Sequence, residues 1–296
     1  MSKPFSIKQV FLEVLGRNLS DDVVIDGLNF CNRKTAKSSI LSFAAHISYV
    51  DEIRNNKAIA ALVVHTNDLL KYKEMLTDRD IIIIPDNIPE WVFYDVHEHL
   101  VKNSNFYDSY DFPKRIGANC RIHPTAIIED GVIIEDYVTI GAYSFIGRGS
   151  TISSGTVIEN NTSIASNGFQ IIKKGSQIRH ITHCGGVFIG KNAYIRNNTC
   201  IDQALFEGYT FIGANAHIDN LVHVGHNGYV GDGSVVVAGV SLCGSCIIED
   251  GAWIGPNSSV LNNITIGKGA KIGMGSVVTR DVEQGKLAYG VPAKTK

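Results

Sequence analysis

The chain has 296 residues and a formal net charge of -2, which gives no electrostatic indication of a nucleic-acid partner. No run of about 18 apolar residues predicts a membrane span, and the N-terminus lacks the long apolar segment of a secretory signal. Six cysteines without the spacing of a disulfide framework are typical of a reducing compartment, so we expect a cytoplasmic protein.

The first part of the chain, residues 1–112, mixes helical and strand patterns. Short apolar runs of buried-strand type alternate with segments whose apolar residues recur at helical spacing. This alternation predicts a small α/β domain, which a polar and turn-rich linker over Asn103–Arg115 follows. The predicted elements are a helix over Phe5–Gly16, a strand over Ala58–Val64, a helix over Asn67–Leu76, a strand over Asp80–Pro85 and a helix over Pro89–Asn103.

The second part, residues 113–296, repeats an aliphatic residue at every sixth position from Ile116 to Val278, with two interruptions. Neither a helix nor simple strand alternation has this period. Each hexad is therefore interpreted as one short strand with a tight turn, and three hexads close a triangular coil of roughly eighteen residues. Stacked coils form a parallel β-helix, a triangular prism in which the aliphatic residues point inward.

The two interruptions of the repeat cover residues 165–188 and 202–211. Residues that leave a coil without breaking the stack must loop outward. The longer segment is rich in polar and basic groups, so both loops are candidate walls of a substrate site. The alternative is that they are surface insertions without a role.

In the segment "HIDNLVHVGHNGYVGDG", His217–Gly233, three histidines, an aspartate and an asparagine crowd into the ten residues His217–His226. His217 and His223 occupy the same hexad position and project from successive sides of the prism, whereas His226 falls near a corner. They do not converge within one chain, which argues against a metal site, and His217 fits an ordinary surface position. Cys243 and Cys246 form a CxxC without a second pair of ligands. We therefore expect no metal.

The hexad pattern resembles the left-handed β-helix acyltransferases, the hexapeptide-repeat family. The resemblance implies left-handed coils, although parallel crossovers are usually right-handed. It also implies a homotrimer with active sites in the grooves between neighbouring prisms. The expected fold is a left-handed parallel β-helix preceded by a small α/β N-terminal domain.

The segment "IDNLVHVGHNGYVGD" resembles the active-site coil of the UDP-3-O-acylglucosamine N-acyltransferases of lipid A biosynthesis. This resemblance implies that His226 is the general base and that the Gly244 N–H helps to form an oxyanion hole. Asp219 or a backbone carbonyl is expected to orient the His226 ring and stabilise its imidazolium form, and Asn220 and His223 to line the sugar pocket.

Two further segments resemble loops of the same enzymes, namely "SNGF" (Ser166–Phe169) and "HITHCGG" (His180–Gly186). The resemblance places Asn167, Phe169 and His183 in the substrate site.

The N-terminal domain extends the resemblance through "ILSFAAHISYVDEI", residues 40–53. Phe43 and Tyr49 match aromatic residues that stack on uracil in that family, and aromatic faces tolerate a change of base. His46 stands where the family has asparagine, which leaves thymine open as the base. The alternative for Phe43 and Tyr49 is packing in the domain core.

The C-terminal segment "IGMGSVVTRDVEQGKLAYGVPAK" differs from the lipid A enzymes, which carry a helical extension that engages acyl carrier protein. It resembles the end of acetyl-CoA-dependent hexapeptide transferases. This implies that Arg280, Lys286 and Lys294, together with Gly244, contact CoA, since cations suit its phosphates. The alternative for each cation is a solvated surface charge.

These features favour an N-acyltransferase that moves an acetyl or short acyl group from acyl-CoA to the amine of a nucleotide-linked amino sugar. A UDP- or dTDP-amino sugar for bacterial surface polysaccharide is the expected acceptor, and GDP stays open. The alternative enzyme is the UDP-3-O-acylglucosamine N-acyltransferase of lipid A biosynthesis, with hydroxyacyl-acyl carrier protein as donor. A non-catalytic trimeric scaffold is the alternative from another class.

Overall fold

The computed structural model describes residues 4–33 and 35–296. Contacts divide the chain into two compact units. The first comprises residues 1–109 and 170–182, and the second comprises residues 110–169 and 183–296. The middle of the longer interruption of the repeat, expected as an outward loop of the prism, is therefore part of the first unit.

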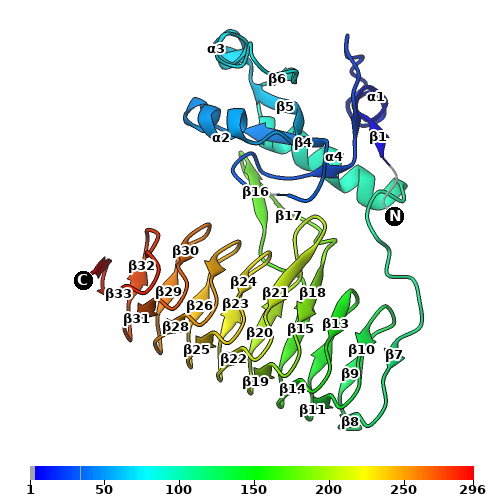
Figure 1. Cartoon of the computed structure of the whole chain (residues 1–296). Helices are drawn as coiled ribbons and strands as arrows, with labels where there is room; N and C mark the ends of the chain where they lie inside the picture. Colours follow the sequence, from blue (N-terminus) through cyan, green and yellow to red (C-terminus); the bar gives the residue numbers. More distant parts are fainter. Residues whose placement is uncertain (1–3, 34) are drawn as a thin grey trace. The chain divides into compact units, whose positions relative to one another are not determined.

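A four-stranded parallel sheet of order β3-β4-β5-β6 forms the centre of the first unit (Figure 1). The predicted helices and strands are confirmed, and helix α2 and strands β1, β2, β3 and β4 are additional. A short antiparallel pair, β1 (Phe5–Ser6) and β2 (Val24–Ile25), lies outside this sheet. The sheet strands are β3 (Gly27–Leu28), β4 (Ile40–Ala44), β5 (Ile59–His65) and β6 (Ile82–Asp86). The helices are α1 (Ile7–Leu15), α2 (Val50–Asn55), α3 (Leu69–Met75) and α4 (Pro89–Asn103), with 3₁₀ turns at Ile47–Tyr49 and Thr66–Asp68.

Local sequence signals fix the ends of these helices. Helix α1 begins after Ser6, whose side chain accepts a hydrogen bond from the Gln9 N–H, and it ends at Gly16 in the left-handed conformation. Helix α4 begins with Pro89, which suits the first helical turn because its missing N–H would have no partner there.

A hairpin of β16 (Ile171–Lys174) and β17 (Gln177–His180) also belongs to the first unit and packs on α4. Arg179 pairs with Asp95 at 2.5 Å and lies over the ring of Trp91. Glu98 accepts hydrogen bonds from the Thr182 N–H and hydroxyl.

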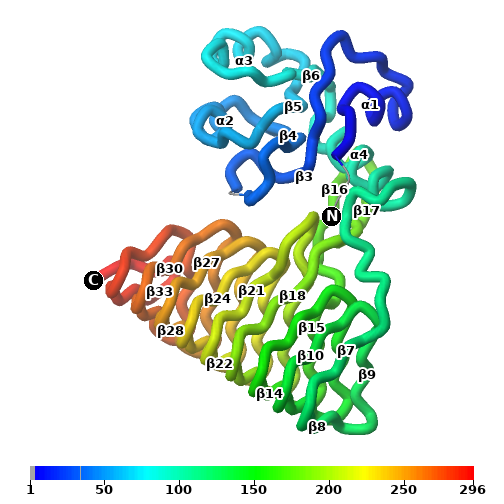
Figure 2. Tube along the Cα trace, turned by 45° about the vertical axis from the view of Figure 1, so that its right-hand side comes forward, coloured from blue at the N-terminus to red at the C-terminus, as the bar shows by residue number. Residues whose placement is uncertain are grey.

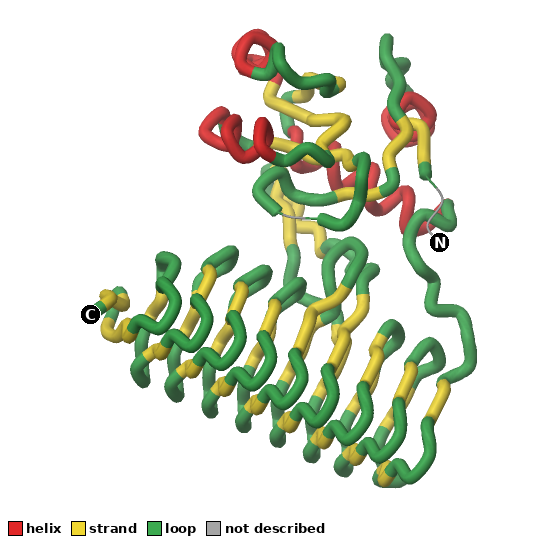
Figure 3. The backbone as a smooth tube through the Cα atoms, viewed as in Figure 1, coloured by secondary structure: helices red, strands yellow, loops and turns green. Residues whose placement is uncertain are grey.

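The second unit is a triangular prism of short parallel strands (Figures 1 and 2). Each strand pairs in register with the strand one coil later, so that Ile134 lies beside Ile152 and Ile140 beside Ile158. Figure 3 shows the alternation of strand and turn along the coils. The parallel β-helix that the hexads predict is confirmed.

The prism has three faces, which the chain visits in turn. The first face contains β7 (Arg115–Ile116), β10 (Ile133–Ile134), β13 (Ser150–Ile152), β18 (Gly186–Ile189), β21 (Tyr209–Ile212), β24 (Tyr229–Val230), β27 (Ile247–Ile248) and β30 (Thr265–Ile266). The second contains β8 (Arg121–Ile122), β11 (Thr139–Ile140), β14 (Val157–Ile158), β19 (Tyr194–Ile195), β22 (His217–Ile218), β25 (Val235–Val236), β28 (Trp253–Ile254), β31 (Lys271–Ile272), β33 (Leu287–Gly290) and β34 (Ala293–Thr295). The third contains β9 (Ile127–Ile128), β12 (Phe145–Ile146), β15 (Ser163–Ser166), β20 (Cys200–Asp202), β23 (His223–Val224), β26 (Ser241–Leu242), β29 (Ser259–Val260) and β32 (Val277–Val278).

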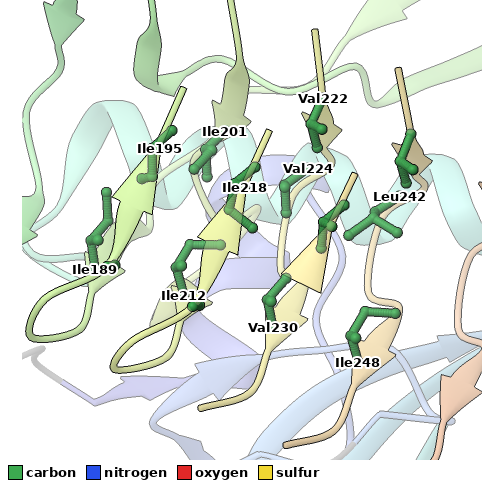
Figure 4. Packing of buried hydrophobic residues seen from close by; sticks show 14 of the residues in the cluster. Ile189, Ile195, Ile201, Ile212, Ile218, Val222, Val224, Val230, Leu242 and Ile248 are labelled. Carbon is green, nitrogen blue, oxygen red and sulfur yellow. The ribbon is translucent and has the colours of Figure 1, made fainter. Parts of the chain in front are cut away.

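The hexad aliphatic residues form the core of the prism (Figure 4). Ile189, Ile201, Ile212 and Val224 are completely buried, each stacked between its equivalents in neighbouring coils. Burial of one such side chain contributes about 1.5–3 kcal/mol relative to its exposure. Asparagine often occupies the corner position that needs a positive φ, as at Asn215 and Asn227.

Both interruptions of the repeat leave the prism at the corner between the third and first faces. The longer segment follows β15 and ends before β18, and the shorter follows β20 and ends before β21. Asp202 lies in β20 and Tyr209–Phe211 lie in β21, so the shorter loop has fewer residues than the predicted range 202–211. Within the described residues, no helix combines the length and apolar character needed to cross a bilayer.

Candidate active site

His226 lies at the corner between the third and first faces, in the turn that joins β23 to β24. The residue is buried, with only 8% of its surface exposed. The ring nitrogen Nδ1 lies 3.1 Å from Asn227 Oδ1. Asn227 takes the left-handed corner conformation with φ of 57°, which directs its side chain back toward the preceding residue's ring.

The hydrogen bonds of Asn227 determine which nitrogen of neutral His226 carries the proton. The Leu205 N–H donates to the same Asn227 oxygen at 2.9 Å, so this atom must be an acceptor. His226 Nδ1 therefore donates its hydrogen to Asn227, and Nε2 holds the lone pair. Leu205 belongs to the shorter loop, so this loop helps to set the tautomer of the His226 ring through Asn227. Asn227 was not among the predicted site residues.

Gly244 lies against the His226 ring, one coil further along the same corner. A Cβ atom at Gly244 would lie 2.7 Å from His226 Nε2 and 2.8 Å from Cε1, so no other residue fits without moving the ring. The structure therefore brings together the two residues that the sequence predicted as base and oxyanion donor.

The backbone N–H of Gly244 lacks a hydrogen-bond acceptor within residues 4–33 and 35–296. At the same hexad position in other coils, some of these N–H groups are capped by a side chain of the next coil: Ala118 donates to Asp136, Ala142 to Asn160 and Ala214 to Asp232. The N–H of Gly244 is thus available to an oxyanion beside the ring of the base.

His183 packs edge-on against His226, with ring centroids 5.4 Å apart and an interplanar angle of 65°. It is 5% exposed, and a Cβ at Gly168 would meet its Nε2 at 2.6 Å. Gly168 and His183, from the two ends of the longer interruption, therefore lie side by side, and His183 contacts the ring of His226. His183 and Phe169 stay predictions as substrate contacts, and Phe169 is 73% exposed.

Gln203 connects the two interruptions. Its Nε2 donates to Asn167 Oδ1 at 2.7 Å and to the His183 carbonyl at 3.2 Å. Its backbone N–H donates to the Ser166 carbonyl. The sequence did not single out Gln203, although its place at the start of the shorter interruption was a usable signal.

His223 forms an ion pair with Asp202 on the outer side of the third face, with Nε2 and Oδ2 3.0 Å apart. Asp202 is 5% exposed. Its hydrogen bond raises the pKa of His223 above the ordinary value, against the opposing effect of burial. Asp202 was missed because the sequence placed it in a loop.

Asp219 and Asn220 lie one corner earlier, between the second and third faces. Asp219 accepts a hydrogen bond from the Asn220 N–H and pairs with Arg196 at 3.4 Å. Asn220 Oδ1 accepts from the Asn197 amide groups. The expectation that Asp219 orients the His226 ring is corrected, because within one chain Asn227 makes that hydrogen bond.

The three predicted cation contacts lie in the last coils of the prism, and Arg280 lies at the same corner between the third and first faces, beyond Gly244 along the stack. Arg280 follows β32, Lys286 precedes β33 and Lys294 is in β34, and all three are exposed. Across the described residues, no group of three or more histidine, cysteine or acidic side chains could hold a metal ion. Cys246 lies buried in the prism core.

In the first unit, Phe43 is half-buried in an aromatic cluster, with ring centroids 5.0 Å from Phe93 and 5.8 Å from Phe30. His46 Nδ1 accepts from the Ser48 N–H and begins the 3₁₀ turn that contains Tyr49. Tyr49 is partly buried and packs on the core. Packing thus accounts for part of the Phe43 and Tyr49 surfaces and leaves part exposed.

The family description "Bacterial transferase hexapeptide (six repeats)" matches residues 113–148 and 245–280. The prism is a hexapeptide-repeat β-helix. Among solved structures, a UDP-N-acetylglucosamine acyltransferase from Bacteroides fragilis is similar, with 26% identity, a TM-score of 0.54, and coverage of 62% of this chain and 69% of its own. The expectation of a left-handed parallel β-helix after a small α/β domain is confirmed, as is the resemblance to these acyltransferases.

Curated relatives of the chain are named as UDP-3-O-acylglucosamine N-acyltransferases, among them proteins of Legionella pneumophila and Helicobacter pylori. UDP-3-O-acylglucosamine N-acyltransferase 2 of Legionella pneumophila (strain Lens) is 43% identical over 79 residues, which are 27% of this chain and 23% of the relative. UDP-3-O-acylglucosamine N-acyltransferase of Helicobacter pylori is 51% identical over 65 residues, 22% of this chain and 19% of the relative. The aligned part thus spans less than a quarter of either relative's length.

These relatives correct the expected function. The sequence favoured a CoA-dependent N-acetyltransferase for UDP- or dTDP-amino sugars, on the strength of the C-terminal segment. That expectation is wrong, because the relatives bear the name of the alternative enzyme. Acetyl-CoA as donor and a role in surface polysaccharide lose their support with it.

Proposed function

We propose that the protein is an N-acyltransferase that acylates the amine of UDP-3-O-acylglucosamine, the lipid A step. The observation that carries the proposal is the corner where His226 Nε2 faces Gly244, because this corner supplies a base and an oxyanion donor within one contact. The names of the relatives support the same acceptor.

The reaction needs a neutral amine, a polarised thioester and a path for one proton. The amine nitrogen attacks the thioester carbonyl carbon, and His226 Nε2 takes the amine proton as the C–N bond forms. The Gly244 N–H stabilises the oxyanion, a contribution of about 3 kcal/mol by analogy with other oxyanion donors. The C–S bond then breaks, and the proton on His226 passes to the leaving thiolate, which leaves an amide and a free thiol.

Asn227 acts in this mechanism through the base. Its Oδ1 accepts the Nδ1 hydrogen of His226, so Nε2 is the nitrogen that receives the amine proton. A general base held in this way contributes about 10²–10⁴-fold to the rate.

A hydroxyacyl-acyl carrier protein is the proposed donor. Arg280, Lys286 and Lys294 were predicted as contacts for CoA; in this proposal they contact the phosphate of the carrier's pantetheine arm instead, since cations suit this group. Phe43, His46 and Tyr49 stay predictions as contacts for the uracil base. A homotrimer is part of the proposal, because hexapeptide-repeat prisms typically assemble in threes.

The test gives the purified protein UDP-3-O-acylglucosamine and a 3-hydroxyacyl-acyl carrier protein, and detects the N-acylated sugar by mass spectrometry. Stoichiometric release of the carrier thiol with formation of the amide supports the proposal. A protein that forms no amide with this pair, while its fold and oligomeric state are intact, would contradict it.

A further inference from the structure

A second histidine of the active-site coil is built into an ion pair. His223 lies three residues before His226 in the chain, on β23, and its Nε2 lies 3.0 Å from Asp202 Oδ2. Asp202 is on β20, the neighbouring strand of the third face, where Cys200 pairs with His223 in register. The Asp202 side chain is 7% exposed and that of His223 is 46% exposed. The carboxylate is therefore enclosed while the imidazole reaches the surface.

Few charged groups surround this pair. From β20, Cys200 donates its thiol hydrogen to Asp202 Oδ1 at 3.6 Å, and burial together with Asp202 raises the pKa of Cys200 to about 12. The thiol is thus neutral. On the other side, β26 contributes Ser241 and Leu242, which do not titrate. His223 is therefore the one countercharge that the described residues offer to Asp202.

A buried carboxylate is costly without a partner, so the enclosure of Asp202 favours the protonated form of His223. The direction of the His223 pKa agrees, since the hydrogen bond to Asp202 raises it. The other ring nitrogen, Nδ1, has no protein partner in the described part of the chain. A charged N–H donor is thus presented to solvent, on the coil that carries the base.

We propose that Asp202 is a positioning residue that holds His223 as a cationic binding group for a phosphate ester of a substrate. This inference rests on the proposed function, in which both substrates carry such a group. The acceptor has the diphosphate of its nucleotide, and the donor has the phosphate of its pantetheine arm. A charge-assisted hydrogen bond from Nδ1 to a phosphate oxygen is the contact in either case.

The test is calorimetric titration of the full-length protein with inorganic pyrophosphate and, separately, with pantetheine 4′-phosphate, between pH 6 and 9. His223 Nδ1 donates as part of a cation below its raised pKa, so binding should weaken as pH rises through that value. Asp202→Asn should move this loss of affinity to lower pH and weaken binding about tenfold at neutral pH. His223→Gln should remove the loss of affinity that follows deprotonation of His223 and leave only the pH dependence that the phosphate of the probe itself causes.

His217→Gln is the matched control, because His217 lies on β22, stacks on Tyr194 and has no place in the site. It should leave affinity and pH dependence unchanged. The probe whose binding depends on pH and on His223 identifies the substrate whose phosphate His223 contacts. Pyrophosphate stands for the acceptor, and pantetheine 4′-phosphate stands for the donor. The proposal is overturned if Asp202→Asn and His223→Gln both bind the probes with the affinity and pH dependence of the unmodified protein. It is also overturned if neither probe binds.

If Asp202→Asn does not fold, the His223→Gln titration alone decides between these outcomes. The readout does not depend on turnover. An inactive protein that still binds a phosphate probe through His223 contradicts the proposed function and leaves this inference standing. If the protein is active but His223→Gln binds both probes as the unmodified protein does, the proposed function stands and this inference is wrong.

Discussion

Gly244 lies directly against the ring of His226, so closely that a Cβ atom on Gly244 would lie 2.7 Å from Nε2. The contact follows from the repeat, because the two residues occupy the same corner in consecutive coils. Base and oxyanion donor are therefore positioned by the stacking of coils rather than by a flexible loop.

Gly244→Ala should reduce kcat by about 10²-fold, because the new methyl group must push His226 Nε2 away from the acceptor amine. The backbone of Gly244 does not need a positive φ, so the melting temperature should change little. Gly233→Ala is the control: its φ of 63° strains the backbone, yet a Cβ there meets nothing within 4 Å. It should lower stability and spare turnover. Equal kcat values for Gly244→Ala and the unmodified protein would contradict the geometry.

His226→Ala should lower kcat by about 10²-fold or more, since the amine proton loses its acceptor. Steady-state kinetics measures the effect, and sedimentation velocity checks that assembly is unchanged. Turnover at the rate of the unmodified protein would exclude His226 as the base.

Asn227→Gly should reduce turnover about tenfold by removing the oxygen that holds His226 Nδ1. Glycine keeps the positive φ of this corner, so the change isolates the side chain. Asn215→Gly makes the same exchange at a corner with φ of 53°, away from His226. A comparable fall in both variants would assign the effect to the fold rather than to the base.

Phe43→Leu should raise KM for the UDP-sugar with less effect on kcat, because it removes a half-buried aromatic face. Phe93→Leu provides the contrast, since Phe93 is completely buried in the same cluster. That variant should lower stability by about 1 kcal/mol with KM nearly unchanged. Denaturant unfolding and kinetics on both proteins separate the two roles, and an unchanged KM in Phe43→Leu returns Phe43 to the core.

Ile195→Ala should lower the free energy of unfolding by about 2–5 kcal/mol, because Ile195 is completely buried in the prism core. Ile127→Ala removes the same atoms from a side chain that is 62% exposed, so its effect should stay within about 0.5 kcal/mol. Denaturant midpoints of the two variants measure the difference, and similar midpoints would contradict the inward register of the hexads.

The fold was predictable because the period of six assigns every inward residue of the prism. The pairing of Ile140 with Ile158 and of Val224 with Leu242 follows directly from that period. The same arithmetic placed Gly244 beside His226. In the first unit, α2 escaped prediction because its six residues carry little periodic signal.

The rest of the site depends on contacts that cross the interruptions of the repeat. Asn227 receives a hydrogen bond from Leu205, and Gln203 joins Asn167 to His183. No periodicity links these positions, because the path of a loop is set by its own packing. Asp219 was misassigned for a related reason: similarity of sequence placed it near the base, but the coil separates the two by one face.

The donor was misjudged from the C-terminal coils, where charged side chains alone cannot distinguish one phosphate-bearing molecule from another. Arg280, Lys286 and Lys294 are exposed, and a carrier-linked arm presents the same anion as a free cofactor.

Because each coil contacts only the coils next to it, the prism should open from its ends, one coil after another. The coil with His226 has many coils on either side, from β7 at one end to β34 at the other. Fraying must therefore cross several interfaces before it reaches the base. The coils outside the site act as end protection, and amide exchange should slow progressively toward the centre of the stack.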